Sequence, residues 1–149
     1  MVGNTDGSAI YYEHETGTDQ VNAGGVVTAI TANVLSGDFD ITQKRSAQGQ
    51  ILGAPDMRGD GEYIMKIRRF LPDFISQAGD TRVTLFLRNY PNNSAASSSL
   101  GPFTITSSTG KVDTRARARA IALKIENTST SQNWKLGTFR LDIQPDGRR

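Results

Sequence analysis

The feature that most constrains the fold is a run of short apolar segments with a period of two, separated by turn-forming residues. Residues 63–68 and 82–90 carry apolar side chains at every second position. This period is that of a β-strand with one buried face. Clusters of Gly, Pro, Asn and Ser interrupt such segments every 8–12 residues or so, a spacing typical of sandwiches and barrels. The sequence therefore predicts an all-β fold, an antiparallel β-sandwich of immunoglobulin-like or jelly-roll-like type.

The same criteria place the other strands and the loops between them. Pro72 should end the strand that starts near residue 62, because proline cannot donate to a ladder. Residues 145–147, Pro-Asp-Gly, should close the last strand. We expect further strands over 8–13, 26–35 (continued by 38–42), 103–106, 114–125 and 134–143, and loops over 46–61 and 91–101.

The segment 114–125 allows two interpretations. Its alanines favour a helix, whereas the spacing of two between Ile121 and Leu123 favours a strand, which we predict. A continuous strand would place the arginines of its first half on the same face as these apolar residues. Three unpaired guanidinium groups cannot share a buried face. Either a bulge near Ala120 inverts the face, or the arginine end extends past the core to a partner surface.

The last strand contains a similar change of phase. Trp134 and Leu136 occupy even positions, whereas Phe139 and Ile143 occupy odd ones. Gly137 lies at the change. The sequence therefore predicts a bulge there, with Gly137 in the left-handed backbone region.

Composition excludes several kinds of chemistry. The chain has no cysteine, so disulfides, thiolate zinc sites and cysteine nucleophiles are excluded. His14 is the single histidine, and its position between Glu13 and Glu15 indicates a solvated surface rather than a metal ligand or base. No spacing singles out a pair of catalytic carboxylates. We predict no catalytic, cofactor-binding or metal-binding residues, and therefore a protein that is not an enzyme.

The net charge of +2 hides an asymmetry along the chain. Residues 1–43 contain six acidic and no basic residues, whereas residues 44–149 contain 17 basic and nine acidic ones. We expect acidic N-terminal strands over 1–43 and the β-sandwich over 44–149. Such asymmetry is typical of complementary surfaces in a self-assembling subunit, or of contact with nucleic acid or membrane. No run of about 18 apolar residues predicts a membrane segment, and the first residues lack the pattern of a secretory signal.

Basic residues are densest in two of the predicted strands. They would contact phosphates or acidic faces of neighbouring subunits, or else form a solvated strand face. Few aromatic residues lie among them, which argues against stacking on single-stranded bases. The candidate subunit-contact residues are Lys66, Arg68, Arg69, Arg115, Arg117 and Arg119.

The C-terminal sequence Trp134–Arg149 resembles the end of the tail nozzle, or tail-tube, proteins of short-tailed bacteriophages. The resemblance covers residues 59–149 well and residues 1–20 loosely. It departs from the family at Ala118, where members often have glycine. The other segments that carry it are Gly59–Tyr63, Leu71–Phe74, Arg88–Pro91, Gly101–Thr104, Thr114–Arg119, and Gly3–Gly7 with Ile10 and Tyr11.

The resemblance implies a virion tail protein, made in the bacterial host cytoplasm and needing no cofactor. Its partners would be further copies in a ring, commonly sixfold, neighbouring tail proteins, and phage DNA in transient passage. Family members are several hundred residues long, so the chain would be their C-terminal portion, with residues 1–43 as the remnant of a last propeller blade. Because phosphate attraction would impede passing DNA, we expect Arg115, Arg117 and Arg119 to pair with carboxylates or backbone carbonyls.

Other functions are compatible with the same residues. The main alternative is a carbohydrate-binding β-sandwich at a tail tip, with aromatic side chains as stacking platforms. A nucleic-acid binder and a glycosidase with loop carboxylates are further alternatives. The candidate platforms are Tyr11, Tyr12, Tyr63, Tyr90 and Trp134.

Overall fold

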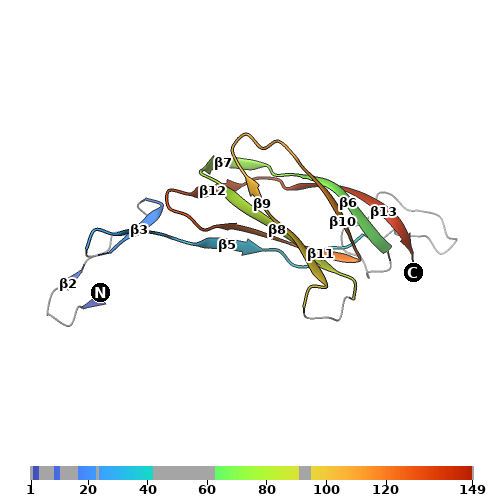
Figure 1. Cartoon of the computed structure of the whole chain (residues 1–149), viewed down its shortest axis with the longest axis horizontal. Coiled ribbons are helices and arrows are strands. Elements are labelled where there is room, and N and C mark those ends of the chain that lie inside the picture. Colours follow the sequence, from blue (N-terminus) through green and yellow to red (C-terminus); the bar gives the residue numbers. More distant parts are fainter. Residues whose placement is uncertain are drawn as a thin grey trace.

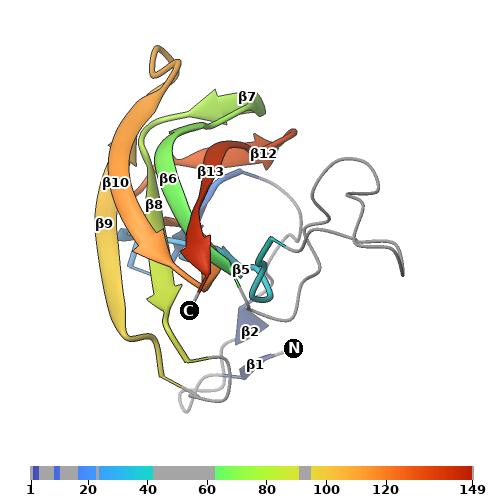
Figure 2. The same cartoon turned by 90° about the vertical axis from the view of Figure 1, so that its right-hand side faces the viewer.

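The computed structural model describes residues 2–3, 9–10, 17–22, 24–41, 63–90 and 95–148. Every regular element in these ranges is a β-strand, and all pairings are antiparallel. The predicted all-β sandwich is confirmed (Figures 1 and 2). The strands are β1 (Val2–Gly3), β2 (Ala9–Ile10), β3 (Asp19–Val21), β4 (Val27–Ala29), β5 (Ala32–Leu35), β6 (Tyr63–Leu71), β7 (Phe74–Ala78), β8 (Thr81–Arg88), β9 (Ser98–Ile105), β10 (Val112–Ala118), β11 (Ala120–Asn127), β12 (Asn133–Leu136) and β13 (Arg140–Arg148).

Two sheets make up the sandwich. One has the strand order β10-β6-β13 and the other the order β5-β11-β8-β9. β7 follows β6 in the chain and β12 precedes β13. The pair β12-β7 therefore continues the β6–β13 pairing after an interruption in both strands. The hairpins β1-β2 and β3-β4 are separate two-stranded sheets.

The core lies between the two sheets, where the predicted alternation puts it. In β8, Val83 and Leu85 are fully buried, whereas Arg82 is exposed and Thr84 is half-buried. Phe70 of β6 is also fully buried, and its ring packs edge-on against Phe103 of β9 at 5.5 Å between centroids. It stacks on Phe139 at 5.2 Å. Phe70 therefore joins both sheets and the segment that leads into β13.

Residues 114–125 are extended, as predicted, but they belong to two strands in different sheets. β10 ends at Ala118 in one sheet, and β11 begins at Ala120 in the other. On β10 the buried positions are even, at Ala116 and Ala118. β11 starts with a fully buried run, residues 120–123, and then continues with odd buried positions, at Ile125 and Asn127. The face does invert near Ala120, but its cause is the passage between sheets at residue 119 rather than a bulge in one strand.

Gly137 differs from its predicted conformation, because its φ is not among the positive ones. The reason for glycine here is space. Its N–H donates to the carbonyl oxygen of Asp73 at 2.8 Å, and a Cβ would lie 2.7 Å from that same oxygen. The pairing of β12 with β7 does shift register just before Gly137, between Lys135 and Leu136, so the irregularity predicted here is present, but glycine is needed for the close approach of two backbones and not for a positive φ.

Several strand boundaries also differ from prediction. β6 ends at Leu71, as Pro72 requires, but the sequence pattern missed β7, which pairs with β12. β9 begins at Ser98, inside the predicted loop 91–101. β13 does not close at residues 145–147: a register shift follows Pro145, and pairing resumes at Arg148 opposite Tyr63.

The single strand expected over 26–35 is instead two strands in different sheets. β4 pairs with β3, whereas β5 pairs with β11. Beyond β5, Phe39 bridges Ile121, and Ile41 is buried in the core. Part of the acidic segment 1–43 therefore belongs to the sandwich itself.

Candidate subunit-contact face

The outer face of the sheet β10-β6-β13 carries most of the predicted contact residues, and we call it the basic face. On β6, Lys66 and Arg68 are exposed on either side of the buried Ile67. On β10, Arg115 and Arg117 are exposed on either side of the buried Ala116. The alternation that buries the apolar side chains thus directs the cations outward.

Arg69 is flanked by acidic residues. It lies opposite Asp113 of β10 and Asp142 of β13 in the strand register. Its Nε is 3.4 Å from Asp142 and 3.8 Å from Asp113, although this atom is buried and makes no hydrogen bond. The acid–base–acid row neutralises the charge of Arg69 within the sheet.

Arg117 is also paired inside the chain. Its Nε donates to a carboxylate oxygen of Asp146 at 2.5 Å, and its Nη2 reaches the backbone carbonyl of Asp146 at 3.5 Å. Arg117 thus has the carboxylate and carbonyl partners that the sequence led us to expect. Its neighbours in the register are less favourable, since Lys66 lies directly opposite it, with Gln144 on the other side of Lys66.

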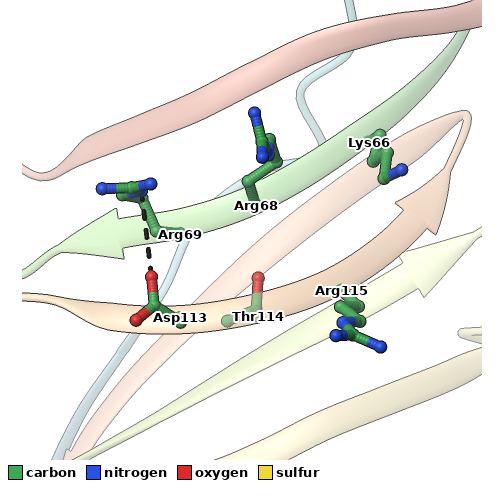
Figure 3. Close-up of a pocket in the computed structure, with 6 residues that line it drawn as sticks. All are labelled: Lys66, Arg68, Arg69, Asp113, Thr114 and Arg115. Atoms are coloured by element: carbon green, nitrogen blue, oxygen red, sulfur yellow. Dashed lines mark ion pairs between the residues drawn. The ribbon is translucent and has the colours of Figure 1, made fainter.

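Three cations remain without a partner. Among the described residues, the side chains of Lys66, Arg68 and Arg115 have neither a hydrogen bond nor an ion pair. They line a shallow hollow of about 440 Å³ between β6 and β10, together with Arg69, Asp113 and Thr114 (Figure 3). The Thr114 hydroxyl is not free to bind a ligand there, because it donates to the carbonyl oxygen of Ile67. The hollow therefore presents a net positive charge to solvent.

Arg119 lies apart from these three. It occupies the passage between the sheets, where its backbone N–H donates to the carbonyl oxygen of Arg88. Its side chain lines a second hollow of about 270 Å³ with Ile64, Asn89, Tyr90 and Arg117. The six predicted residues thus form a group of five on the basic face and one at the sheet crossing.

The predicted stacking platforms have different environments. Trp134 is half-buried and packs edge-on against Phe74, with 6.3 Å between ring centroids. Tyr63 is half-buried, and Tyr90 is 71% exposed. Tyr11 and Tyr12 lie outside the described residues. Tyr90 is therefore the platform most accessible to a ligand in the part that the structure describes.

The described ranges contain no cluster of three or more His, Asp or Glu residues that could hold a metal ion. No helix in these ranges could cross a membrane. His14 with its two glutamates and the loop 46–61 lie outside the described residues.

Sequence reasoning missed the carboxylates that pair with the arginines. Asp113, Asp142 and Asp146 come from β10 and β13, which flank β6 on opposite sides. Only the strand register brings them to Arg69 and Arg117, and no spacing in the sequence gives that register.

Comparison of the sequence with protein-family models and with curated proteins gives no match.

Proposed function

We propose that the chain is a structural subunit of a phage tail nozzle, a virion part through which DNA is ejected, and that it acts through contacts with other copies of itself. The observation that carries the subunit contact is the group of three unpaired cations, Lys66, Arg68 and Arg115, on one sheet face. The assignment to a phage tail rests on the sequence resemblance of residues 59–149.

Electrostatics supports an anionic counterpart for the basic face. Cations on neighbouring strands repel one another, and an anion that binds between them removes this repulsion. Within the chain, carboxylates already pair with Arg69 and Arg117 and with Arg88, whose partner is Asp38. The same chemistry in a second copy would neutralise the remaining three. A contact between two different surfaces of identical copies closes into a ring when the rotation allows it.

The mass of the particle in solution tests this proposal. We expect a closed oligomer by native mass spectrometry, and a shift toward monomer in the double variant Lys66→Gln/Arg68→Gln. The matched control is Arg82→Gln/Lys135→Gln, which removes the same charges from exposed positions on β8 and β12. A wild-type protein that stays monomeric would overturn the proposal, as would equal assembly of the two variants. Unchanged assembly with weaker DNA binding would assign the face to nucleic acid instead.

Carbohydrate binding is the second candidate, favoured by the environment of Tyr90. An exposed aromatic ring beside amide and guanidinium donors offers a sugar both stacking and hydrogen bonds. Tyr90 and Asn89 share a hollow with Arg117 and Arg119. A glycan array would give hits that Tyr90→Ala abolishes if this function is correct, whereas a nozzle subunit should give none.

A further inference from the structure

The outer edge of β5 is open among the described residues. β5 pairs with β11 along one edge, and no described strand pairs with the other edge. Figure 1 shows β5 along the lower left of the sandwich. Val34 is 48% exposed and Leu35 is 59% exposed, so the strand presents apolar side chains to solvent beside its free backbone groups.

The other three edges of the sandwich carry features that prevent strand addition. β9 contains Pro102 and a register shift, and β13 contains Pro145 and two register shifts. β10 carries two outward arginines and a register shift. Charges, prolines and bulges are the devices by which sheet edges avoid pairing with other chains. β5, with the sequence Ala-Asn-Val-Leu, has none of them.

Hydrogen bonds to β11 show which backbone groups of β5 point outward. The N–H of Ser36 donates to the carbonyl oxygen of Leu123, and the N–H of Ala32 donates to the side chain of Asn127. Even-numbered residues therefore direct their backbone groups toward β11. Since these groups alternate sides in an antiparallel strand, Asn33 and Leu35 direct theirs away from the sandwich.

We propose that the outer edge of β5 pairs with β5 of a second copy of this chain, antiparallel and about a two-fold axis. The register that satisfies the outward groups sets Asn33 opposite Leu35 of the second copy, and Leu35 opposite its Asn33. Val34 then faces Val34 of the second copy. A two-fold axis sets each residue against its own kind or its symmetric partner, so an uncharged strand suits it. β10, with its arginines, would oppose like charges.

This contact is separate from the basic face and does not rest on the assignment to a phage tail. It is isologous, because the same strand contributes both sides, and it lies in the other sheet of the sandwich. Pairing would cover Val34 and Leu35 and continue the four-stranded sheet into that of the second copy.

A single cysteine tests the register. The chain has no cysteine, so a disulfide in a Val34→Cys variant can form only between copies. Residues facing each other in a non-hydrogen-bonded antiparallel pair have Cα atoms about 4.5 Å apart, within the range of a disulfide. We expect Val34→Cys to form a covalent dimer under mild oxidation at least tenfold faster than Val27→Cys. Val27, on β4, is the matched control because it is 51% exposed. Equal rates would overturn the proposal.

A charge at the same position tests the contact without covalent chemistry. Val34→Lys sets two lysines against each other across the axis, so we expect the concentration-dependent dimer to be lost, whereas Val27→Lys keeps it. Thermal unfolding of both variants verifies that they fold. A folded Val34→Lys protein that dimerises like the control contradicts the proposal. Loss of the dimer in Lys66→Gln/Arg68→Gln but not in Val34→Lys would assign the association to the basic face alone.

Discussion

At Gly137 the neighbouring backbone leaves no room for a side chain. A Cβ there would meet the carbonyl oxygen of Asp73 at 2.7 Å, and that oxygen belongs to backbone rather than to a side chain that can move. We expect Gly137→Ala to lower the free energy of unfolding by about 1–3 kcal/mol, the usual cost of overpacking. Urea denaturation measures it.

Gly110 supplies the control for this substitution. A Cβ on Gly110 meets nothing within 4 Å, and its φ is not positive. Gly110→Ala should therefore leave the free energy of unfolding within about 0.5 kcal/mol of the wild type. Equal effects of the two substitutions would show that the contact with Asp73 has no energetic role.

The sequence pattern predicted that a glycine is required at position 137, but it attributed this requirement to a positive φ, which Gly137 does not have. The change of phase between Leu136 and Phe139 marks an irregular backbone, and glycine is common at such places because it tolerates positive φ. A close approach to another strand leaves the same trace in the sequence. Only the position of Asp73, 64 residues earlier in the numbering, distinguishes the two.

Asn127 holds the N-terminal elements to the sandwich. Its side chain is buried, accepts from the N–H of Ala32 at 3.0 Å, and donates to the carbonyl oxygens of Ile30 and Gln132. It therefore joins the start of β5 to the turn after β11. Asp19 adds a second link, because its carboxylate accepts the N–H of Ser131.

We expect Asn127→Ala to lower the free energy of unfolding by about 1–3 kcal/mol, since three backbone groups lose their partner. Hydrogen exchange should accelerate at Ala32 and Ser36 more than in β8, because β5 is held along one edge only. The control Asn33→Ala removes an exposed side-chain amide on β5 and should have little effect on either measurement. Uniform acceleration across the sandwich would mean that Asn127 stabilises the fold globally rather than β5.

The elements that the sequence predicted well are those with one clean buried face. β8 alternates between core and half-buried or exposed positions along its whole length, and β6 does so from Met65 to Arg68, so the pattern gives both their existence and their orientation. β7 is mostly exposed and has no such alternation, because its place in the fold comes from pairing with β12. The crossing of the chain from one sheet to the other at residue 119 could not be predicted from the sequence, for a related reason. Alanines fill the buried positions of β10, and small residues give little contrast between faces.

Assembly of the whole molecule should depend on salt. If Lys66, Arg68 and Arg115 bind carboxylates of another copy, screening weakens the contact, because the Debye length falls from about 10 Å at 0.1 M to about 3 Å at 1 M. We expect the average particle mass from light scattering to fall over this range in the wild type. In Lys66→Gln/Arg68→Gln the dependence should be shallower. A salt response identical in both proteins would argue against ionic contacts at these residues.

At the scale of the whole molecule, the fold class followed from the sequence and the contacts between copies did not. Periodicity indicates which face of a strand is buried, and that is sufficient to predict a sandwich. It does not report what covers the outer face, because an exposed arginine paired inside the chain and one awaiting a partner look alike in a sequence. Arg117 and Arg115 illustrate this, two positions apart on β10 with different environments.

The passage of the chain from β10 to β11 has a mechanical consequence. One residue, Arg119, separates a strand of one sheet from a strand of the other. Two Cα–Cα steps span at most about 7 Å, so the end of β10 and the start of β11 cannot separate further than this while both strands stay in their ladders. A force that pulls the two sheets apart at this corner therefore acts on the β6–β10 and β8–β11 pairings together. A displacement of one sheet at this corner is therefore passed on directly to the other.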